Sequence, residues 1–226
     1  MKPPLRLWRL LPAVALLAPL AAQDYRLAQT NPAFAPVKDD PSLPRALLIG
    51  DSISIGYTVP VRRLLAGKVN LHRIPTNGGP TIKGVEELDS WTGADNWDVI
   101  HFNWGLHDLR IMETGKHQVS IDDYAKNLRT LVARLKKTGA KLIWASTTPV
   151  PEGKLSPLRH PEDVPRYNAA AAAVMRENGV AINDLYGFAF PLLGEIQRPA
   201  NVHFTDAGSA KLAEPVAAAI LKALGK

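Results

Sequence analysis

Residues 45–52 read Arg-Ala-Leu-Leu-Ile-Gly-Asp-Ser, a short apolar run that ends in a glycine, an acid and a serine. An apolar run of this length, bounded by turn residues, is typical of a strand buried on both faces, so we predict a strand over 46–49. The glycine allows a tight turn, which leaves Ser52 at the carboxyl end of that strand. The folded domain is therefore expected to begin at Arg45.

Further apolar runs repeat this pattern along the chain. Each has the length of a buried parallel strand, and we predict strands over 69–74, 99–102, 141–145 and 180–183. Helical spacing fills several of the intervals between them. The predicted helices run from a Thr58 cap through Pro60 to Leu65, from a Ser120–Asp123 capping box to Gly139, over 167–175, and from a Thr205 cap to Leu224.

The alternation of strands and helices predicts the fold class. Strands separated by helices form a parallel sheet covered on both faces, so we expect a three-layer α/β/α sandwich with a five-stranded parallel sheet. In such sheets the functional site lies at the carboxyl ends of the strands. The long, polar, proline-rich stretch 149–165 is expected to contribute a pocket rim or lid at this edge.

The first 22 residues have the pattern of a signal peptide. Basic residues precede an apolar core over 10–20, and the small residues Ala21 and Ala22 follow. Because a membrane-spanning helix needs about 20 apolar residues, we expect cleavage near Ala22, a secreted or periplasmic protein, and no stable membrane insertion after cleavage. An uncleaved membrane anchor is the alternative. Residues 23–44, which contain four prolines, are expected to form an extended lead-in to one domain over 45–226.

Charge and residue clusters indicate neither a nucleic-acid partner nor a metal. The net charge of +6 includes three basic residues within 1–22, so residues 23–226 carry +3, spread along the chain rather than gathered on one stretch. His101, His107 and Asp108 are close in sequence, but His101 is expected inside the strand over 99–102. The chain has no cysteine, no His-x-x-x-His pattern and no glycine-rich phosphate loop after the first strand. We therefore expect no cofactor and no nucleic-acid partner.

Residues with catalytic potential follow three of the predicted strands and precede the last helix. Ser52 is a candidate nucleophile, although serine is also a common turn residue. Gly79 lies in an Asn-Gly-Gly stretch that suits either an oxyanion hole or a plain turn. His107 suits either an oxyanion donor or a buried histidine, and His203 either a general base or a structural residue. Because all four fall where the carboxyl edge is expected, together they favour a catalytic site.

In this order the motifs resemble the SGNH (GDSL-type) hydrolase family. The matching blocks are Gly50-Asp51-Ser52, Asn77-Gly78-Gly79, Gly105-Leu106-His107-Asp108 and Asn201-Val202-His203-Phe204. The resemblance covers essentially all of residues 45–226 and implies a flavodoxin-like α/β fold and serine esterase activity. It also implies that Ser52 is the nucleophile, that His203 is the base, and that Ser52, Gly79 and His107 form the oxyanion hole.

Two positions depart from the family pattern. His107 stands where the family has an asparagine that holds the oxyanion, and a neutral imidazole can still donate one hydrogen bond. Asn103 and Asp108 are expected to be supporting residues of the site. Ala200 stands three residues before His203, where the family has the aspartate that orients the histidine. Asp206 is expected in the first turn of the last helix and is not assigned this role. We therefore expect a Ser–His dyad, unless a backbone carbonyl or another side chain orients His203.

These residues lead to one expected function and two alternatives. We expect a secreted serine esterase that removes a short acyl group, acetyl first, from a polysaccharide or a small ester, with the tryptophans at 91, 97 and 104 as either a sugar-binding surface or core residues. A non-catalytic carbohydrate-binding protein is one alternative, motivated by His107 and Ala200. An esterase of the lipase or lysophospholipase type is the other.

Overall fold

The computed structural model describes residues 30–226, so the expected signal peptide and the first residues of the lead-in lie outside the described residues. Within this range the strands form one parallel sheet with the order β2-β1-β3-β4-β5. Every strand bound lies within one residue of the prediction, and the five-stranded parallel sheet is confirmed. The strands are β1 (Arg45–Ile49), β2 (Asn70–Arg73), β3 (Val99–Phe102), β4 (Lys141–Ala145) and β5 (Ala181–Asn183).

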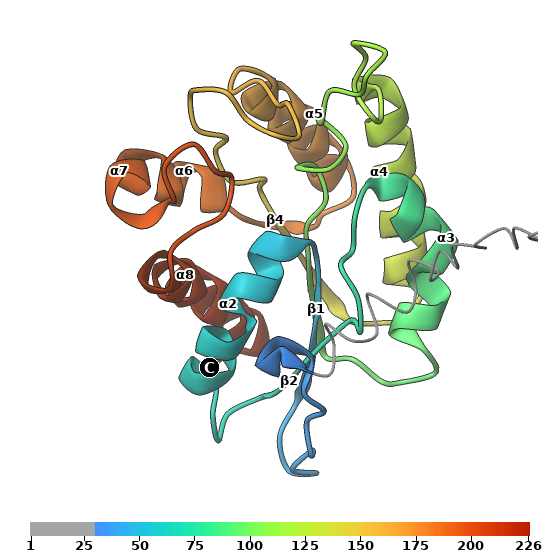
Figure 1. Cartoon of the computed structure of the whole chain (residues 1–226). Helices are drawn as coiled ribbons and strands as arrows, with labels where there is room; N and C mark the ends of the chain where they lie inside the picture. The colour runs from blue at the N-terminus through green and yellow to red at the C-terminus, as the bar shows by residue number, and fades with distance from the viewer. Residues whose placement is uncertain (1–29) are drawn as a thin grey trace, which may run out of the picture.

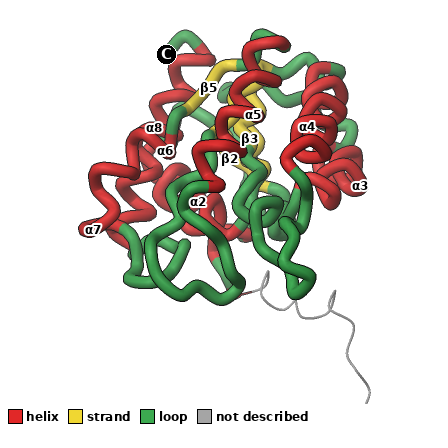
Figure 2. Tube along the Cα trace, turned by 90° about the horizontal axis from the view of Figure 1, so that it is seen from above, coloured by secondary structure: helices red, strands yellow, loops and turns green. Residues whose placement is uncertain are grey.

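Helices cover both faces of the sheet, which confirms the three-layer sandwich. On one face α2 (Ser52–Leu64) lies against α8 (Asp206–Leu224), and on the other face α3 (Thr81–Thr92), α4 (Ile121–Lys136) and α5 (Asp163–Glu177) lie side by side (Figure 1). Seen from above, the strands lie between the α8 side and the α4 side (Figure 2). Short elements complete the described chain: η1 (Pro32–Phe34), α6 (Leu185–Ala189), η2 (Phe190–Leu192) and α7 (Leu193–Ile196).

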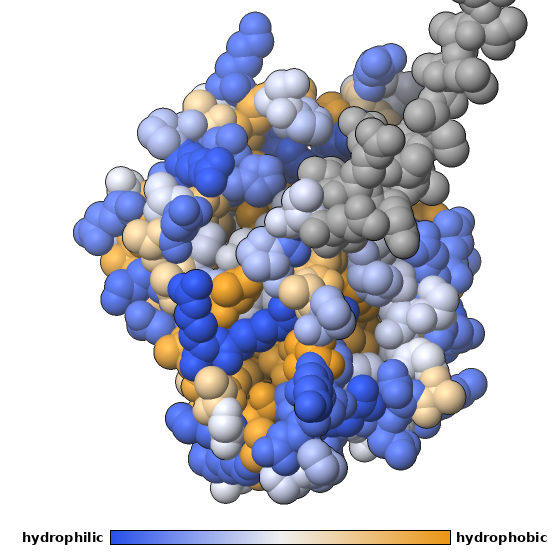
Figure 3. All heavy atoms as spheres, turned by 60° about the horizontal axis from the view of Figure 1, so that its bottom comes forward, coloured by the Kyte–Doolittle hydropathy of each residue, from blue (hydrophilic) through white to orange (hydrophobic). Residues whose placement is uncertain are grey.

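The hydrophobic core lies on both faces of the central strands. Leu48 in β1 and Phe102 in β3 have no exposed surface, as the apolar strand runs predict. Trp91, Trp97 and Trp104 belong to this core, with 6%, 6% and 1% of their surface exposed. The interpretation of these tryptophans as a sugar-binding surface is therefore wrong. On the face shown in Figure 3, hydrophilic residues surround smaller hydrophobic areas.

The start of α2 differs from the prediction, and the difference positions Ser52. The helix begins at Ser52 rather than after Thr58, because the Asp51 carboxylate accepts the N–H of Ile53 at 2.9 Å and caps the helix seven residues earlier. Thr58 lies inside the helix, where its hydroxyl donates to the carbonyl of Ser54 at 2.7 Å. Pro60 is also inside the helix. Ser52 therefore occupies the first turn of a helix that leaves the carboxyl end of β1.

Two predicted helix starts are confirmed, whereas α3 and the short helices α6 and α7 were not predicted. The hydroxyl of Ser120 caps α4 by accepting the N–H of Asp123 at 3.2 Å, and Thr205 caps α8 by accepting the N–H of Gly208 at 2.9 Å. The Ala-rich helix extends beyond 167–175 to the bounds of α5. Helix α3 has no capping side chain at Pro80, so the sequence before it lacks the usual start signal.

The described part of the lead-in is held against the edge strand β2. Asn70 donates to the carbonyls of Asp40 and Leu43, at 2.8 and 3.1 Å, and accepts the N–H of Asp40 at 3.0 Å. Residues 32–34 form η1 rather than an extended segment, with the Asn31 side chain as its cap. Among residues 30–226, no helix combines the length and apolar character needed to cross a membrane.

Candidate active site

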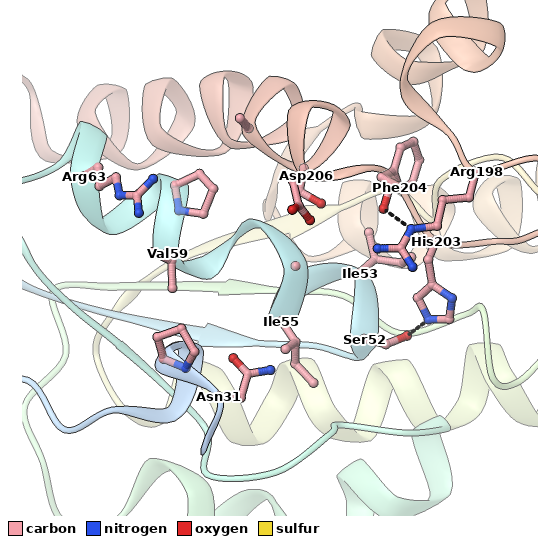
Figure 4. Close-up of a pocket in the computed structure, with 15 residues that line it drawn as sticks. Asn31, Ser52, Ile53, Ile55, Val59, Arg63, Arg198, His203, Phe204 and Asp206 are labelled. Atoms are coloured by element: carbon pink, nitrogen blue, oxygen red, sulfur yellow. Dashed lines mark hydrogen bonds between the residues drawn. The ribbon is translucent and has the colours of Figure 1, made fainter. Parts of the chain in front are cut away.

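The carboxyl edge of the sheet brings Ser52 and His203 together. Ser52 comes from the turn after β1, and His203 comes from the loop before α8, 151 positions later. Their side chains form a hydrogen bond of 2.8 Å between Ser52 Oγ and His203 Nε2, drawn as a dashed line in Figure 4. This distance is within the reach that a general base needs to take the proton of a nucleophile.

The other nitrogen of His203 is held by Asn201, a contact that the sequence analysis did not predict. Asn201 Oδ1 lies 2.7 Å from His203 Nδ1 and also accepts the backbone N–H of His203 at 2.9 Å. Asn201 precedes the histidine by two residues, whereas the expected aspartate position, Ala200, precedes it by three. Ala200 has a left-handed backbone with φ of 47° and is exposed on the rim. A side chain therefore orients His203, but it comes from the neighbouring position.

The backbone contact of Asn201 fixes the proton positions on His203. A backbone N–H is always a donor, so the amide atom that faces it is the carbonyl oxygen Oδ1 and not the NH₂ group. The same oxygen faces His203 Nδ1, which must then carry the proton. Nε2 is therefore unprotonated in the neutral ring and accepts the hydroxyl proton of Ser52. This is the tautomer that a serine nucleophile requires of its base.

The surroundings of His203 lower its pKa, so the ring stays neutral at a lower pH than the ring of an exposed histidine does. Burial lowers the pKa of His203, and Arg198 and Arg159 lower it further by repelling the imidazolium, while Asp51 opposes them. A lowered pKa leaves the ring unprotonated, and so able to act as a base, throughout the neutral range.

Two of the three candidate oxyanion donors are free to act in this structure. The N–H of Ser52 has no acceptor among the described residues, because it lies in the first turn of α2. His107 lines the same pocket as Ser52 and His203, and its ring has no hydrogen-bond partner among the described residues. Burial lowers the pKa of His107, which favours the neutral ring. The N–H of Gly79 instead donates to Asn77 Oδ1 at 2.9 Å. Gly79 can donate to an oxyanion only if its N–H first breaks the hydrogen bond to Asn77 Oδ1.

Asn103 and Asp108 support the loops rather than face the nucleophile. Asn103 donates from Nδ2 to the carbonyl of Ala145 at 2.7 Å, which ties the end of β3 to the end of β4. Asp108 is fully buried and accepts the N–H and the hydroxyl of Thr81, at 2.9 and 2.5 Å, where α3 begins. Burial raises the pKa of Asp108 to about 6. Both residues therefore fix the exit loop of β3 that carries His107.

A buried arginine that the sequence analysis did not single out holds the turn before Ser52. Arg73, at the end of β2, donates to the carbonyls of Gly50 and Thr76, at 3.2 and 3.1 Å, and to the hydroxyls of Ser54 and Thr58, at 3.0 and 3.2 Å. Burial lowers the pKa of Arg73 to about 10. The guanidinium therefore joins the ends of β1 and β2 to the first turns of α2.

The glycines of the motifs permit close approach of the loops. Gly105 has φ of 148°, and a side chain there would collide with Thr147 at the exit of β4. A side chain at Gly78 would meet the carbonyl oxygen of Gly50 at 3.0 Å, and the N–H of Gly78 donates to that same oxygen at 3.0 Å. These contacts bring the three strand-end loops against one another.

Two hollows meet at Ser52 and His203. A groove of about 630 Å³ runs along α2 and the start of α8, with Ser52 and His203 at one end and Val59 and Arg63 toward the other (Figure 4). A smaller pocket of about 250 Å³ lies on the side of His107. Leu155, Ser156, Pro157 and Arg159 line the smaller pocket, so the loop 149–165 contributes to its rim as predicted. These two hollows offer space on either side of Ser52 for the acyl part and the alcohol part of an ester.

The sheet-edge serine, its histidine and the free donors near them define a serine hydrolase of the α/β/α class. Residues 48–211 match the model of the GDSL-like lipase/acylhydrolase family. The chain therefore belongs to this family, as the motifs indicated, and it is an enzyme that hydrolyses carboxylic esters.

Solved structures share this fold at low sequence identity. An acetyl xylan esterase is 17% identical, with a TM-score of 0.67 over 78% of this chain and 99% of that one. A lipase/acylhydrolase from Enterococcus faecalis is 20% identical, with a TM-score of 0.66 over 78% and 95%. An acetylxylan esterase from Geobacillus stearothermophilus is 19% identical, with a TM-score of 0.64 over 81% and 94%. No curated protein sequence matches the chain.

Proposed function

We propose that the enzyme is exported and removes short acyl groups, acetyl first, from carbohydrate through an acyl-enzyme on Ser52. The observation that carries the catalytic part is the chain of contacts from Asn201 to His203 to Ser52, at 2.7 and 2.8 Å. Export rests on the signal-peptide pattern of residues 1–22. The acetyl-carbohydrate substrate is supported by the similarity in fold to two acetylxylan esterases.

In the proposed first half-reaction, Ser52 Oγ attacks the ester carbonyl while His203 Nε2 takes its proton. In the imidazolium that forms, the Nδ1–H of His203 still donates a hydrogen bond to Asn201 Oδ1. When the tetrahedral intermediate collapses, His203 donates a proton to the departing alcohol. Water then attacks the acyl-enzyme while His203 takes one of its protons. When this second intermediate collapses, His203 returns the proton to Ser52 Oγ and the acid leaves.

The negative oxygen of the tetrahedral intermediate is proposed to face the N–H of Ser52 and the ring of His107. The N–H lies at the positive end of a helix of 13 residues, which favours negative charge there. Gly79 is the third proposed donor. Its N–H would have to break the hydrogen bond to Asn77 Oδ1 and donate to the substrate oxygen instead. Donors held in place before the reaction stabilise the transition state more than they stabilise the ground state.

Replacing His107 by alanine is expected to lower kcat about 10²- to 10³-fold, because removal of one preorganised oxyanion donor costs about that much. KM for p-nitrophenyl acetate should change little, since the charge on the oxygen develops only in the transition state. His107→Asn, which restores the family's amide, should recover part of the loss. Full activity of His107→Ala would show that the imidazole does not hold the oxyanion.

The groove along α2 supports a second candidate, an esterase for longer acyl chains. Ile53, Ile55, Val59 and Phe204 line this groove, although Arg63, Arg198 and Asp206 line it too. An acetyl group does not need such a volume, whereas a lipid acyl chain or a run of sugar rings does.

A series of p-nitrophenyl esters distinguishes the two candidates. For the proposed deacetylase, kcat/KM is expected to be highest for the acetate and to fall about tenfold or more by the octanoate, and acetate should be released from acetylated xylan or another acetylated glycan. Ser52→Ala, purified in the same way, is the control in each assay. A kcat/KM that rises with chain length, without acetate release from any acetylated glycan, would contradict the proposal and favour the lipase-type enzyme.

A further inference from the structure

The smaller pocket beside the nucleophile is positively charged. It is lined by Ser52 and His203 on one side, by His107 on another, and by the two arginines Arg110 and Arg159. No aspartate or glutamate of residues 30–226 lines it. The charges of this pocket therefore have one sign, unlike those of the groove along α2, where Asp206 accompanies two arginines.

Neither arginine has an acidic partner among the described residues. Arg110 forms no ion pair there, and its Nε is buried without a hydrogen-bond acceptor. Arg159 is only 6% exposed, and it donates from Nε to the carbonyl of Leu106 at 2.7 Å and from Nη1 to the carbonyl of Pro157 at 3.2 Å. Its Nη2 has no acceptor among the described residues. The carbonyl contacts hold the guanidinium in place while they leave its charge unneutralised.

Two such charges repel each other when no anion lies between them. Burial lowers the pKa of Arg159, Arg110 lowers it further, and Asp51 opposes the shift. The carboxylate of Asp51 offsets part of this positive charge from outside the pocket, but it forms no ion pair with either arginine and does not line the pocket. Unpaired charges in a partly desolvated pocket are costly, and a guanidinium binds carboxylates and phosphates in a defined planar geometry. The two guanidinium groups are therefore arranged as in a site that binds an anion.

We propose that Arg110 and Arg159 bind an anionic group, a carboxylate or a phosphate, carried by the alcohol part of the ester substrate. This inference rests on the proposed function, because an acetyl group carries no charge and leaves only the alcohol part to hold the anion. The pocket's size of about 250 Å³ suits a single charged substituent rather than a chain of sugar rings. The substrate class is then an acetyl ester of an acidic carbohydrate or of another anionic alcohol.

Three aryl acetates of similar size test this inference. 4-Acetoxybenzoate carries a carboxylate, 4-acetoxyphenyl phosphate carries a phosphate, and methyl 4-acetoxybenzoate is neutral. The enzyme is assayed at pH 8, where His203 is neutral whether or not Arg159 lowers its pKa. Because the three esters differ in intrinsic reactivity, the readout is the change in their kcat/KM ratio between enzyme variants.

Arg110→Gln and Arg159→Gln are each expected to lower the ratio of anionic to neutral kcat/KM by about ten- to a hundredfold, the range expected when a hydrogen bond to a charged group is lost. The larger drop, for the benzoate or for the phosphate, identifies the anion that the pocket prefers. Added salt should weaken the preference only modestly, since the pocket is partly buried. A variant that folds poorly lowers activity on all three esters and leaves the ratio intact, so loss of folded protein does not imitate the effect.

The matched control is Lys137→Gln, which removes the same charge from the exposed end of α4 at the opposite edge of the sheet. It should leave the ratio unchanged. Ser52-dependent turnover with no change of ratio in either arginine variant would overturn the inference and leave the proposed function standing. Absence of Ser52-dependent turnover on all three esters and on p-nitrophenyl acetate would overturn both.

Discussion

Replacing Ser52 by alanine is expected to lower kcat for p-nitrophenyl acetate by about 10⁶-fold, to the background rate, because removal of the nucleophile from a serine hydrolase costs about that much. The expectation rests on the 2.8 Å contact with His203 and on the position of Ser52 in the first turn of α2. The measurement compares initial rates of wild type and variant, purified identically. A fluorophosphonate probe should label wild type at Ser52 and leave the variant unlabelled.

The control for this experiment is Ser90→Ala, which removes a hydroxyl from an exposed serine of α3 that donates to the carbonyl of Glu87. This variant should keep wild-type activity and probe labelling at Ser52. Circular dichroism and thermal unfolding should show that all three proteins fold. If Ser52→Ala hydrolysed the ester as fast as wild type, the nucleophile would have to be another residue and the mechanism proposed here would be wrong.

The sheet and its functional edge could be predicted because each rests on a local pattern. A parallel strand is buried on both faces, so β1, β3 and β4 appear in the sequence as short apolar runs. The carboxyl end of each strand then locates Ser52 and His107 without further information. The start of α2 could not be located in this way, because Thr58 and Pro60 form a start signal inside a helix that Asp51 caps earlier.

The residues that complete the site depend on contacts distant in sequence or on a backbone conformation. Arg159 contacts the carbonyl of Leu106 across 53 positions, and Arg73 reaches Gly50 across 23. No local spacing indicates either contact. Asn201 was missed for a different reason: the family pattern directs attention to the position of Ala200, and only the left-handed backbone there, with φ of 47°, shows that the loop turns at this point. The side chain two residues before His203 then replaces the one three residues before it.

Asn201 is the positioning residue whose substitution should have the second largest effect. Asn201→Ala removes the acceptor for His203 Nδ1–H and is expected to lower kcat/KM about 10²- to 10⁴-fold, which is the contribution of a correctly placed general base. An amide that turned its NH₂ group toward Nδ1 would stabilise the wrong tautomer, a change that costs about 10⁴ in serine proteases. Here the backbone N–H of His203 prevents that rotation by holding Oδ1 at 2.9 Å.

Asn201→Asp separates this role from a purely structural one through the pH profile. A carboxylate beside Nδ1 stabilises the imidazolium and raises the pKa of His203, which in wild type lies below its ordinary value. Because the base acts when neutral, the acidic limb of kcat/KM should move to higher pH in Asn201→Asp, while activity above that limb stays at or above the wild-type level. Asn201→Ala should lose activity at every pH. If the acidic limb were the same in wild type and Asn201→Asp, and Asn201→Ala kept full activity above it, then Asn201 would not orient the base and His203 would act with Ser52 as a dyad.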